Sequence, residues 1–178
     1  LDKEIQRFNE MCKFEKEAYS EGVTYIAGID EAGRGPLAGP VVAAAVILPE
    51  NVFIPKLDDS KKLSAKQREE LYDKILEKAI TYGVGVADEK CIDEINVLNA
   101  TKKAMEDAVY ALKPLPDFLL TDAVGLPNIS IPQKNIIDGD ALSVTIAAAS
   151  IIAKVTRDRL IDSMDAVYPQ YGFARHKG

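Results

Sequence analysis

The chain has 178 residues, of which 47% are hydrophobic and 28% are charged, a composition typical of a globular domain large enough to bury a core. Its net charge of −6 argues against a general nucleic-acid-binding protein, because such proteins are usually basic. One histidine and two cysteines give little support to a histidine zinc site, a Ser-His-Asp arrangement or a disulfide framework. With no apolar run of membrane-spanning length and no signal-peptide core, we expect a cytoplasmic protein. We also expect a monomer, because nothing in the sequence suggests a dimer interface.

The first part of the chain is predicted to form one helix and then two strands. Apolar residues recur at helical spacing through residues 3–19, so residues 1–21 are expected to be a helical appendage that packs on a domain at residues 22–178. Apolar runs at residues 24–30 and 40–48 predict buried strands. The second run is apolar on both faces, which indicates a central, covered position.

The rest of the chain is predicted to alternate helices and strands. The expected elements are a helix after a Ser64–Gln67 capping box, a strand at 82–86, helices at 88–95 and 97–112, a strand at 118–121, and a long helix from Ser143 to Val167. Asn96 lies at a break, as a helix cap or as a phosphate contact. Residues 129–137 are expected to be irregular or edge-like. These elements predict an α/β fold with a mixed sheet.

Two apolar strands end on carboxylates. Asp30 and Glu31 follow the first strand, and Asp122 follows the strand at 118–121. A strand end holds a carboxylate rigidly, and carboxylate oxygens are hard ligands suited to Mg²⁺ or Mn²⁺. Glycines after Glu31 allow close backbone approach to a ligand, and Arg34 between them could hold a phosphate. The alternative is an ordinary turn between strands that carries two solvated acids.

The segment GIDEAGRGPLAGPVVAAAV, which begins at Gly28, resembles the signature of the ribonuclease HII family. Three further segments agree with it, at residues 59–64, 139–159 and 171–178. The resemblance implies a ribonuclease H-like fold with helices on both faces of the sheet. It also leads us to expect that the chain lacks the family's C-terminal part, because a tyrosine that follows the matching His-Lys-Gly segment has no counterpart here.

The resemblance implies a set of functional residues. Two divalent cations, Mg²⁺ or Mn²⁺, would be held by Asp30, Glu31, Asp122 and Asp140. Asp138 and Asp158 are competitors for the fourth place. The substrate would be contacted by Gly33, Arg34, Gly35, Lys61, Lys62 and Asn96, with the Gly-Arg-Gly loop sensing the 2′-hydroxyl.

The implied reaction is hydrolysis of the RNA strand of RNA–DNA hybrids and cutting on the 5′ side of single ribonucleotides in duplex DNA, giving 3′-hydroxyl and 5′-phosphate ends. An acidic protein can bind nucleic acid in this way if its acids hold cations and its basic residues line one groove. The candidates for that groove are Arg34, Lys61, Lys62, Lys154, Arg157, Arg175 and Lys177. The alternatives are a broader metal phosphatase or DNA nuclease, and a non-catalytic phosphate-binding module built on the glycine loop.

Overall fold

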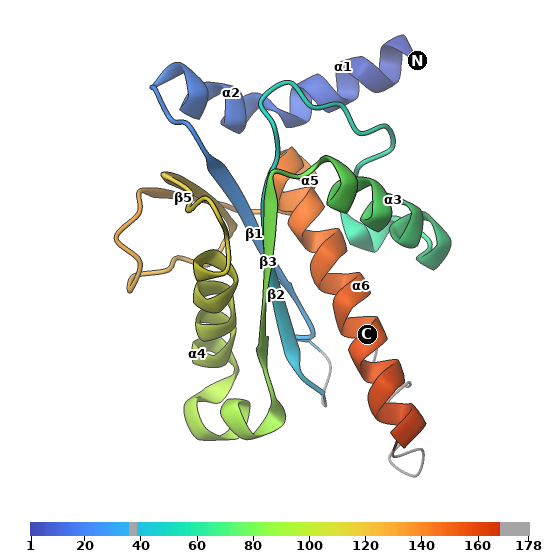
Figure 1. Ribbon diagram of the computed structural model, residues 1–178, viewed down its shortest axis with the longest axis vertical. Coiled ribbons are helices and arrows are strands. Elements are labelled where there is room, and N and C mark those ends of the chain that lie inside the picture. Colours follow the sequence, from blue (N-terminus) through green and yellow to red (C-terminus); the bar gives the residue numbers. More distant parts are fainter. Residues whose placement is uncertain (36–38, 168–178) are drawn as a thin grey trace.

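A mixed sheet with helices on both faces forms the centre of the computed structural model, which describes residues 1–35 and 39–167 (Figure 1). Its strands are β1 (Ile26–Ala32), β2 (Val41–Ile47), β3 (Thr81–Ala87), β4 (Phe118–Asp122) and β5 (Gln133–Ile136), ordered β3-β2-β1-β4-β5. The pairs β1–β2 and β2–β3 are antiparallel, whereas β1–β4 and β4–β5 are parallel. The predicted α/β class with a mixed sheet is confirmed.

The helices form two layers. They are α1 (Asp2–Met11), α2 (Lys13–Ser20), α3 (Ala65–Lys78), α4 (Glu89–Tyr110), α5 (Gly139–Leu142) and α6 (Val144–Val167), with a 3-10 turn η1 (Ser60–Lys62). In Figure 1, α4 covers one face of the sheet, and α6 and α3 cover the other. None of the described helices has an apolar stretch long enough to cross a membrane.

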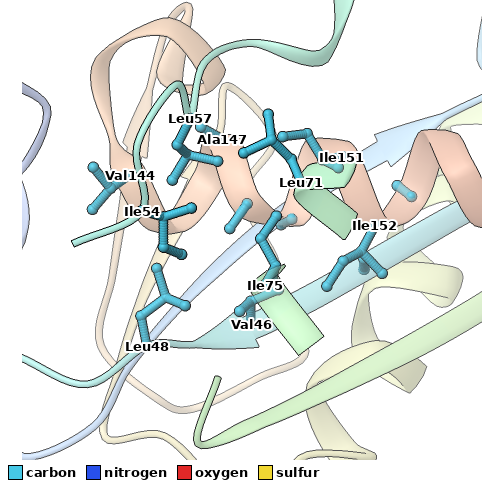
Figure 2. Close-up of a cluster of buried hydrophobic side chains, with 14 of the residues drawn as sticks. Val46, Leu48, Ile54, Leu57, Leu71, Ile75, Val144, Ala147, Ile151 and Ile152 are labelled. Atoms are coloured by element: carbon cyan, nitrogen blue, oxygen red, sulfur yellow. The ribbon is translucent and has the colours of Figure 1, made fainter. Parts of the chain in front are cut away.

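Strand β2 lies at the centre of both layers of the core. All of its residues are buried, and because side chains alternate along a strand, Val46 packs with α3 and α6 whereas Ala45 packs with α4. Figure 2 shows the first cluster, in which Val46 lies with Leu71 and Ile75 of α3 and Ile152 of α6. The predicted central position of this strand is confirmed.

Helix α6 packs unusually close to β1. A Cβ atom added at Gly28 would lie 2.1 Å from the carbonyl carbon of Thr145, so only glycine is compatible with this contact. The small residues Ala147, Ala148 and Ala149 are also fully buried in this half of the helix. Close packing of a small-residue helix on the sheet is therefore confirmed.

The N-terminal segment differs from the prediction. The single helix expected at residues 3–19 is two helices, α1 and α2, with Cys12 between them at φ −91° and ψ 3°. The break lets the two helices bury different residues, because Phe8 and Met11 join the cluster beneath α3 whereas Ala18 joins a separate one. The division of the chain at residue 21 stays a prediction.

Two further expectations concern irregular backbone. Asn96 has φ 68° and ψ 167° and interrupts α4 where a break was predicted. Within residues 129–137, β5 forms the edge strand beside β4, and Pro132 comes directly before it, where a missing N–H costs no ladder hydrogen bond. The short elements α5 and η1 were not predicted.

Candidate active site

Three of the predicted acids lie together at one edge of the sheet. In the parallel register of β1 and β4, Ile29 pairs with Thr121. The next residue of each strand is an aspartate, Asp30 and Asp122, so the two carboxylates lie side by side. Asp140 reaches the same place from α5, and one carboxylate oxygen of each acid lies within 4.8 Å of the other two. We call these three residues the acidic triad.

Glu31 lies beside the acidic triad and is not part of it. It lines the same cleft, and its N–H donates to Asp30 Oδ1 at 2.8 Å. Its Oε2 is buried, and no donor in the described part of the chain reaches that atom. Glu31 therefore offers a carboxylate oxygen to any ligand that enters beside the triad.

The acids open into a cleft of about 500 Å³ that is lined by several predicted substrate contacts. The lining residues are Asp30, Glu31, Ala32, Gly33, Arg34, Gly35, Ser60, Lys61, Arg68, Asp122, Asp140 and Lys154. Acids thus form one part of the cleft, and the glycine loop and basic side chains form the rest. This distribution suits a ligand that carries phosphate and is bound together with cations.

The acids destabilise one another's charged forms. Burial, followed by the charges of Glu31 and Asp122, raises the pKa of Asp30 well above its usual range. Burial, followed by the charge of Asp140, raises the pKa of Asp122 to about 6. Burial also raises the pKa of Glu31. Like charges held together out of water favour protonation or a bound cation, so this donor set fits a hard divalent cation.

Lys61 forms an ion pair with one acid of the triad. Its Nζ lies 3.0 Å from Asp140 Oδ2 and 4.0 Å from Asp59 Oδ2, and three-quarters of the side chain is exposed. Lys61 therefore lines the cleft as predicted, with its ammonium paired to an acid. Lys62 instead lines a neighbouring hollow with Arg7, so the two lysines do not share a site.

Asn96 is also absent from the lining of the acidic cleft. Its side chain is exposed, and its Oδ1 accepts a hydrogen bond from Asn99 N–H at 3.0 Å. Of the two roles left open by the sequence, the structure displays the helix cap. Contact with phosphate stays a prediction.

Arg157 does not line a groove, so its prediction as a groove cation was wrong. Its side chain is fully buried, and its Nε donates to the carbonyl oxygen of Pro40 at 2.8 Å. A Cβ atom at Gly33 would lie 2.1 Å from that Nε. The sequence pattern failed because the charged half of α6 turns one arginine under the glycine loop, where burial lowers its pKa. Arg175 and Lys177 lie outside the described residues.

The two competing acids lie outside the triad. Asp158 pairs with Lys154 at 3.2 Å, and this lysine lines the cleft as predicted. Asp138 is exposed and has φ 58° at the start of α5. The preference for Asp140 as the acid that joins Asp30 and Asp122 therefore agrees with the geometry.

The sequence reasoning missed two residues beside the cleft. Asp59 is buried, accepts a hydrogen bond from Lys61 N–H at 3.0 Å, and has a pKa raised by burial and by Asp140. Arg68 donates to the carbonyl oxygens of Ser60 at 3.1 Å and Leu63 at 2.6 Å, which fixes η1 against α3. Asp59 belongs to a segment that carried the resemblance, whereas Arg68 gave no signal beyond its place in the first turns of a helix.

Comparison with known proteins identifies the relatives of this chain. The family model described as Ribonuclease HII matches residues 27–178. The chain is 66% identical over 177 residues to ribonuclease HII of Acetivibrio thermocellus, covering 99% of this chain and 69% of that protein. It is 53% identical over 178 residues to ribonuclease HII of Caldanaerobacter subterraneus subsp. tengcongensis, covering 100% of this chain and 74% of that protein.

A solved structure supports the same relationship. The crystal structure of ribonuclease H2 from Pyrococcus horikoshii OT3 matches with a TM-score of 0.72 and 30% identity, over 82% of this chain and 77% of that one. The mixed sheet flanked by helices is thus the arrangement found in a ribonuclease H2. The expected ribonuclease H-like fold is confirmed.

Proposed function

The chain belongs to the ribonuclease HII family, and from this premise we propose that it cuts the RNA strand of RNA–DNA hybrids and the 5′ side of single ribonucleotides in duplex DNA. Family membership makes it a nuclease of the ribonuclease H type, and the non-catalytic alternative is not retained. The observation that carries the proposal is the acidic triad, which gathers three buried carboxylates beside the glycine loop.

The proposed cofactor is Mg²⁺ or Mn²⁺, held by Asp30, Asp122 and Asp140 with Glu31 beside them. Two such cations, when bound, supply an activated water and stabilise the negative charge that develops on the scissile phosphate. The protein's own contribution is to hold Asp30 and Asp122 on adjacent strands and Asp140 on α5, where burial and mutual repulsion oppose ionisation without a cation. No protein nucleophile is required.

The glycine loop is proposed to select the substrate. Arg34 is exposed at the mouth of the cleft, and the loop glycines on either side leave backbone groups open to a nucleotide. Selection of RNA over DNA must depend on the 2′-hydroxyl, and we assign its recognition to Gly33, Arg34 and Gly35. Lys61 and Lys154, which also line the cleft, would bind the phosphate backbone of the substrate.

The test is cleavage of a labelled DNA duplex that carries one ribonucleotide, with Mg²⁺ and with EDTA, beside an all-DNA duplex. We expect metal-dependent cutting on the 5′ side of the ribonucleotide, with 3′-hydroxyl and 5′-phosphate products, and no cutting of the all-DNA duplex. Equal cutting of both duplexes would indicate a broader nuclease and overturn the proposed specificity. Light scattering on the same sample tests the expected monomer.

A matched pair of arginine variants tests the role of the loop. Arg34→Ala is expected to lower kcat/KM for the ribonucleotide duplex roughly 10- to 100-fold, because one charged hydrogen-bond donor is lost, and to leave Mn²⁺ affinity unchanged. The control is Arg159→Ala, since Arg159 pairs with Glu69 on the surface and does not line the cleft. Loss of Mn²⁺ affinity with unchanged selectivity in Arg34→Ala would contradict the assignment.

A further inference from the structure

Glu15 of α2 is a buried acid that lies outside the cleft. Only 4% of its surface is exposed, and acids are almost never buried to this degree unless they are paired. It precedes residues 27–178, which the family model matches, yet the relative from A. thermocellus aligns with 99% of the chain. The segment that carries Glu15 is thus shared with that relative, and its buried carboxylate requires an explanation.

The Glu15 side chain accepts hydrogen bonds from residues at the N-terminal end of α6. Its Oε2 accepts hydrogen bonds from the Ser143 hydroxyl at 2.6 Å, from Thr145 N–H at 3.0 Å and from the Thr145 hydroxyl at 2.8 Å. The first turn of a helix has unpaired N–H groups and a positive dipole end, so a carboxylate is stabilising there. Glu15 therefore caps α6 from a distant part of the chain.

Ser143 is the joint between α5 and α6. Its N–H donates to the carbonyl oxygen of Gly139, in α5, at 2.8 Å, and its hydroxyl accepts a hydrogen bond from Ile146 N–H in α6 at 3.3 Å. Helix α5 is a single turn, and a single turn is not stable by itself. The orientation of α5 therefore depends on its attachments, which include this joint and a hydrogen bond from Gly139 N–H to Asp122 Oδ1 at 3.2 Å.

Asp140 is the residue whose position depends on α5. Its carboxylate reaches to within 4.8 Å of the carboxylates of Asp30 and Asp122, which are fixed on adjacent strands. We propose that Glu15 is a positioning residue of the active site, which holds the Ser143 joint and thereby fixes Asp140 against the other two acids. The inference rests on the proposed function, in which these acids bind divalent cations.

The arrangement at Glu15 exceeds what capping of α6 requires. Ser143 already supplies an N-cap hydroxyl to the helix, and within the described residues no donor reaches the buried Oε1 of Glu15. Burial, which raises the pKa of this acid, opposes its charged form. A second, buried acceptor at the N-terminus of α6 is explained if its role is to fix Ser143 between α5 and α6.

The experiment measures Mn²⁺ binding to the whole chain by titration calorimetry, at a temperature where every variant is folded. Glu15→Ala is expected to weaken binding about 10- to 100-fold, the range typical of groups that orient metal ligands. Glu15→Gln keeps an acceptor oxygen and is expected to bind close to wild type. Glu17→Gln is the matched control, since Glu17 lies on the same helix and pairs with Lys134 on the surface. Asp30→Asn gives the baseline for binding outside the triad.

The outcomes separate the two proposals. Wild-type affinity in folded Glu15→Ala, beside a loss in Asp30→Asn, would overturn this inference alone and leave Glu15 as a helix cap. Equal binding by wild type and Asp30→Asn would overturn the proposed metal site and this inference with it. If Glu15→Ala does not fold, Ser143→Ala takes its place, because it removes the hydroxyl at the joint. A several-fold loss of affinity is then expected, and no loss would reject the inference.

Discussion

The acidic triad and Glu15 are both buried carboxylates, and they differ in what surrounds them. Each triad acid faces other acids, so burial and like charge act together to raise the pKa of Asp30 and Asp122. Burial also raises the pKa of Glu15, where three hydrogen bonds from Ser143 and Thr145 oppose the shift. Asp30 and Asp122 each accept one backbone N–H, from Glu31 and Gly139. A buried acid surrounded by donors can join distant parts of the chain, whereas buried acids that face one another favour protonation or a bound cation.

The largest effect predicted by this comparison is on activity. Asp30→Asn should reduce cleavage of a ribonucleotide-containing duplex by roughly a thousand-fold or more, because the triad loses one charged ligand. Its Tm in the absence of metal should stay the same or rise, since a charge opposed by its neighbours has been removed. Activity assays and thermal melts of one preparation check both statements. Wild-type turnover by this variant would remove the triad from the mechanism.

The next largest effect is on stability, at Gly28, which lies between the acidic triad and the Glu15 contacts. Gly28 lies two residues before Asp30 and contacts the backbone of Thr145, where an added Cβ would come within 2.1 Å. Gly28→Ala should therefore cost about 3 kcal/mol of unfolding free energy, because the backbones of β1 and α6 must separate. Urea denaturation measures this cost. Gly35→Ala is the control, because among the described residues, its chain neighbours aside, no atom lies within 4 Å of its added Cβ. Equal stability of the two variants would contradict the packing.

The smallest effect is a dependence of stability on pH. In the metal-free protein the pKa of Asp122 is about 6, above its value in an unfolded chain, so the folded state binds the proton more tightly. Its stabilising contribution is complete below the unfolded pKa and is lost as the pH rises through about 6. Wild type should therefore lose more Tm than Asp122→Asn between pH 5 and pH 8.

Mn²⁺ should reverse this trend in wild type, because a cation competes with the proton for the same oxygens. The gain in Tm on adding Mn²⁺ should be larger at pH 8 than at pH 5. Thermal melts of wild type and Asp122→Asn at both pH values, with and without the metal, provide the comparison. A gain from Mn²⁺ that is the same at both pH values would argue against binding by the triad.

Two acids of the triad could be chosen from local sequence patterns. An apolar run that ends on Asp30 and another that ends on Asp122 are visible as strands that deliver carboxylates, and the resemblance added Asp140. That the strands are parallel neighbours required the structure. The prediction therefore identified the residues, and the fold supplied their proximity.

Glu15 and Arg157 could not be predicted because their burial depends on distant partners. Glu15 lies in an amphipathic segment, where the sequence predicts that charged residues are exposed. Its hydrogen-bond partners are more than a hundred residues away in the chain. Arg157 sits in the charged half of α6, and only its contact with Pro40 places it under the glycine loop. The break at Cys12 was missed for a related reason, since no glycine or proline marks it and the packing of α1 and α2 decides it.

The wide spacing of the triad along the chain has a consequence for biosynthesis. While the protein is being made, Asp30 leaves the ribosome long before Asp122, and Asp140 emerges with the helix that must dock on β1. A nascent chain therefore carries the glycine loop before the three acids of the triad can come together. The triad can therefore form only after Asp140 has emerged.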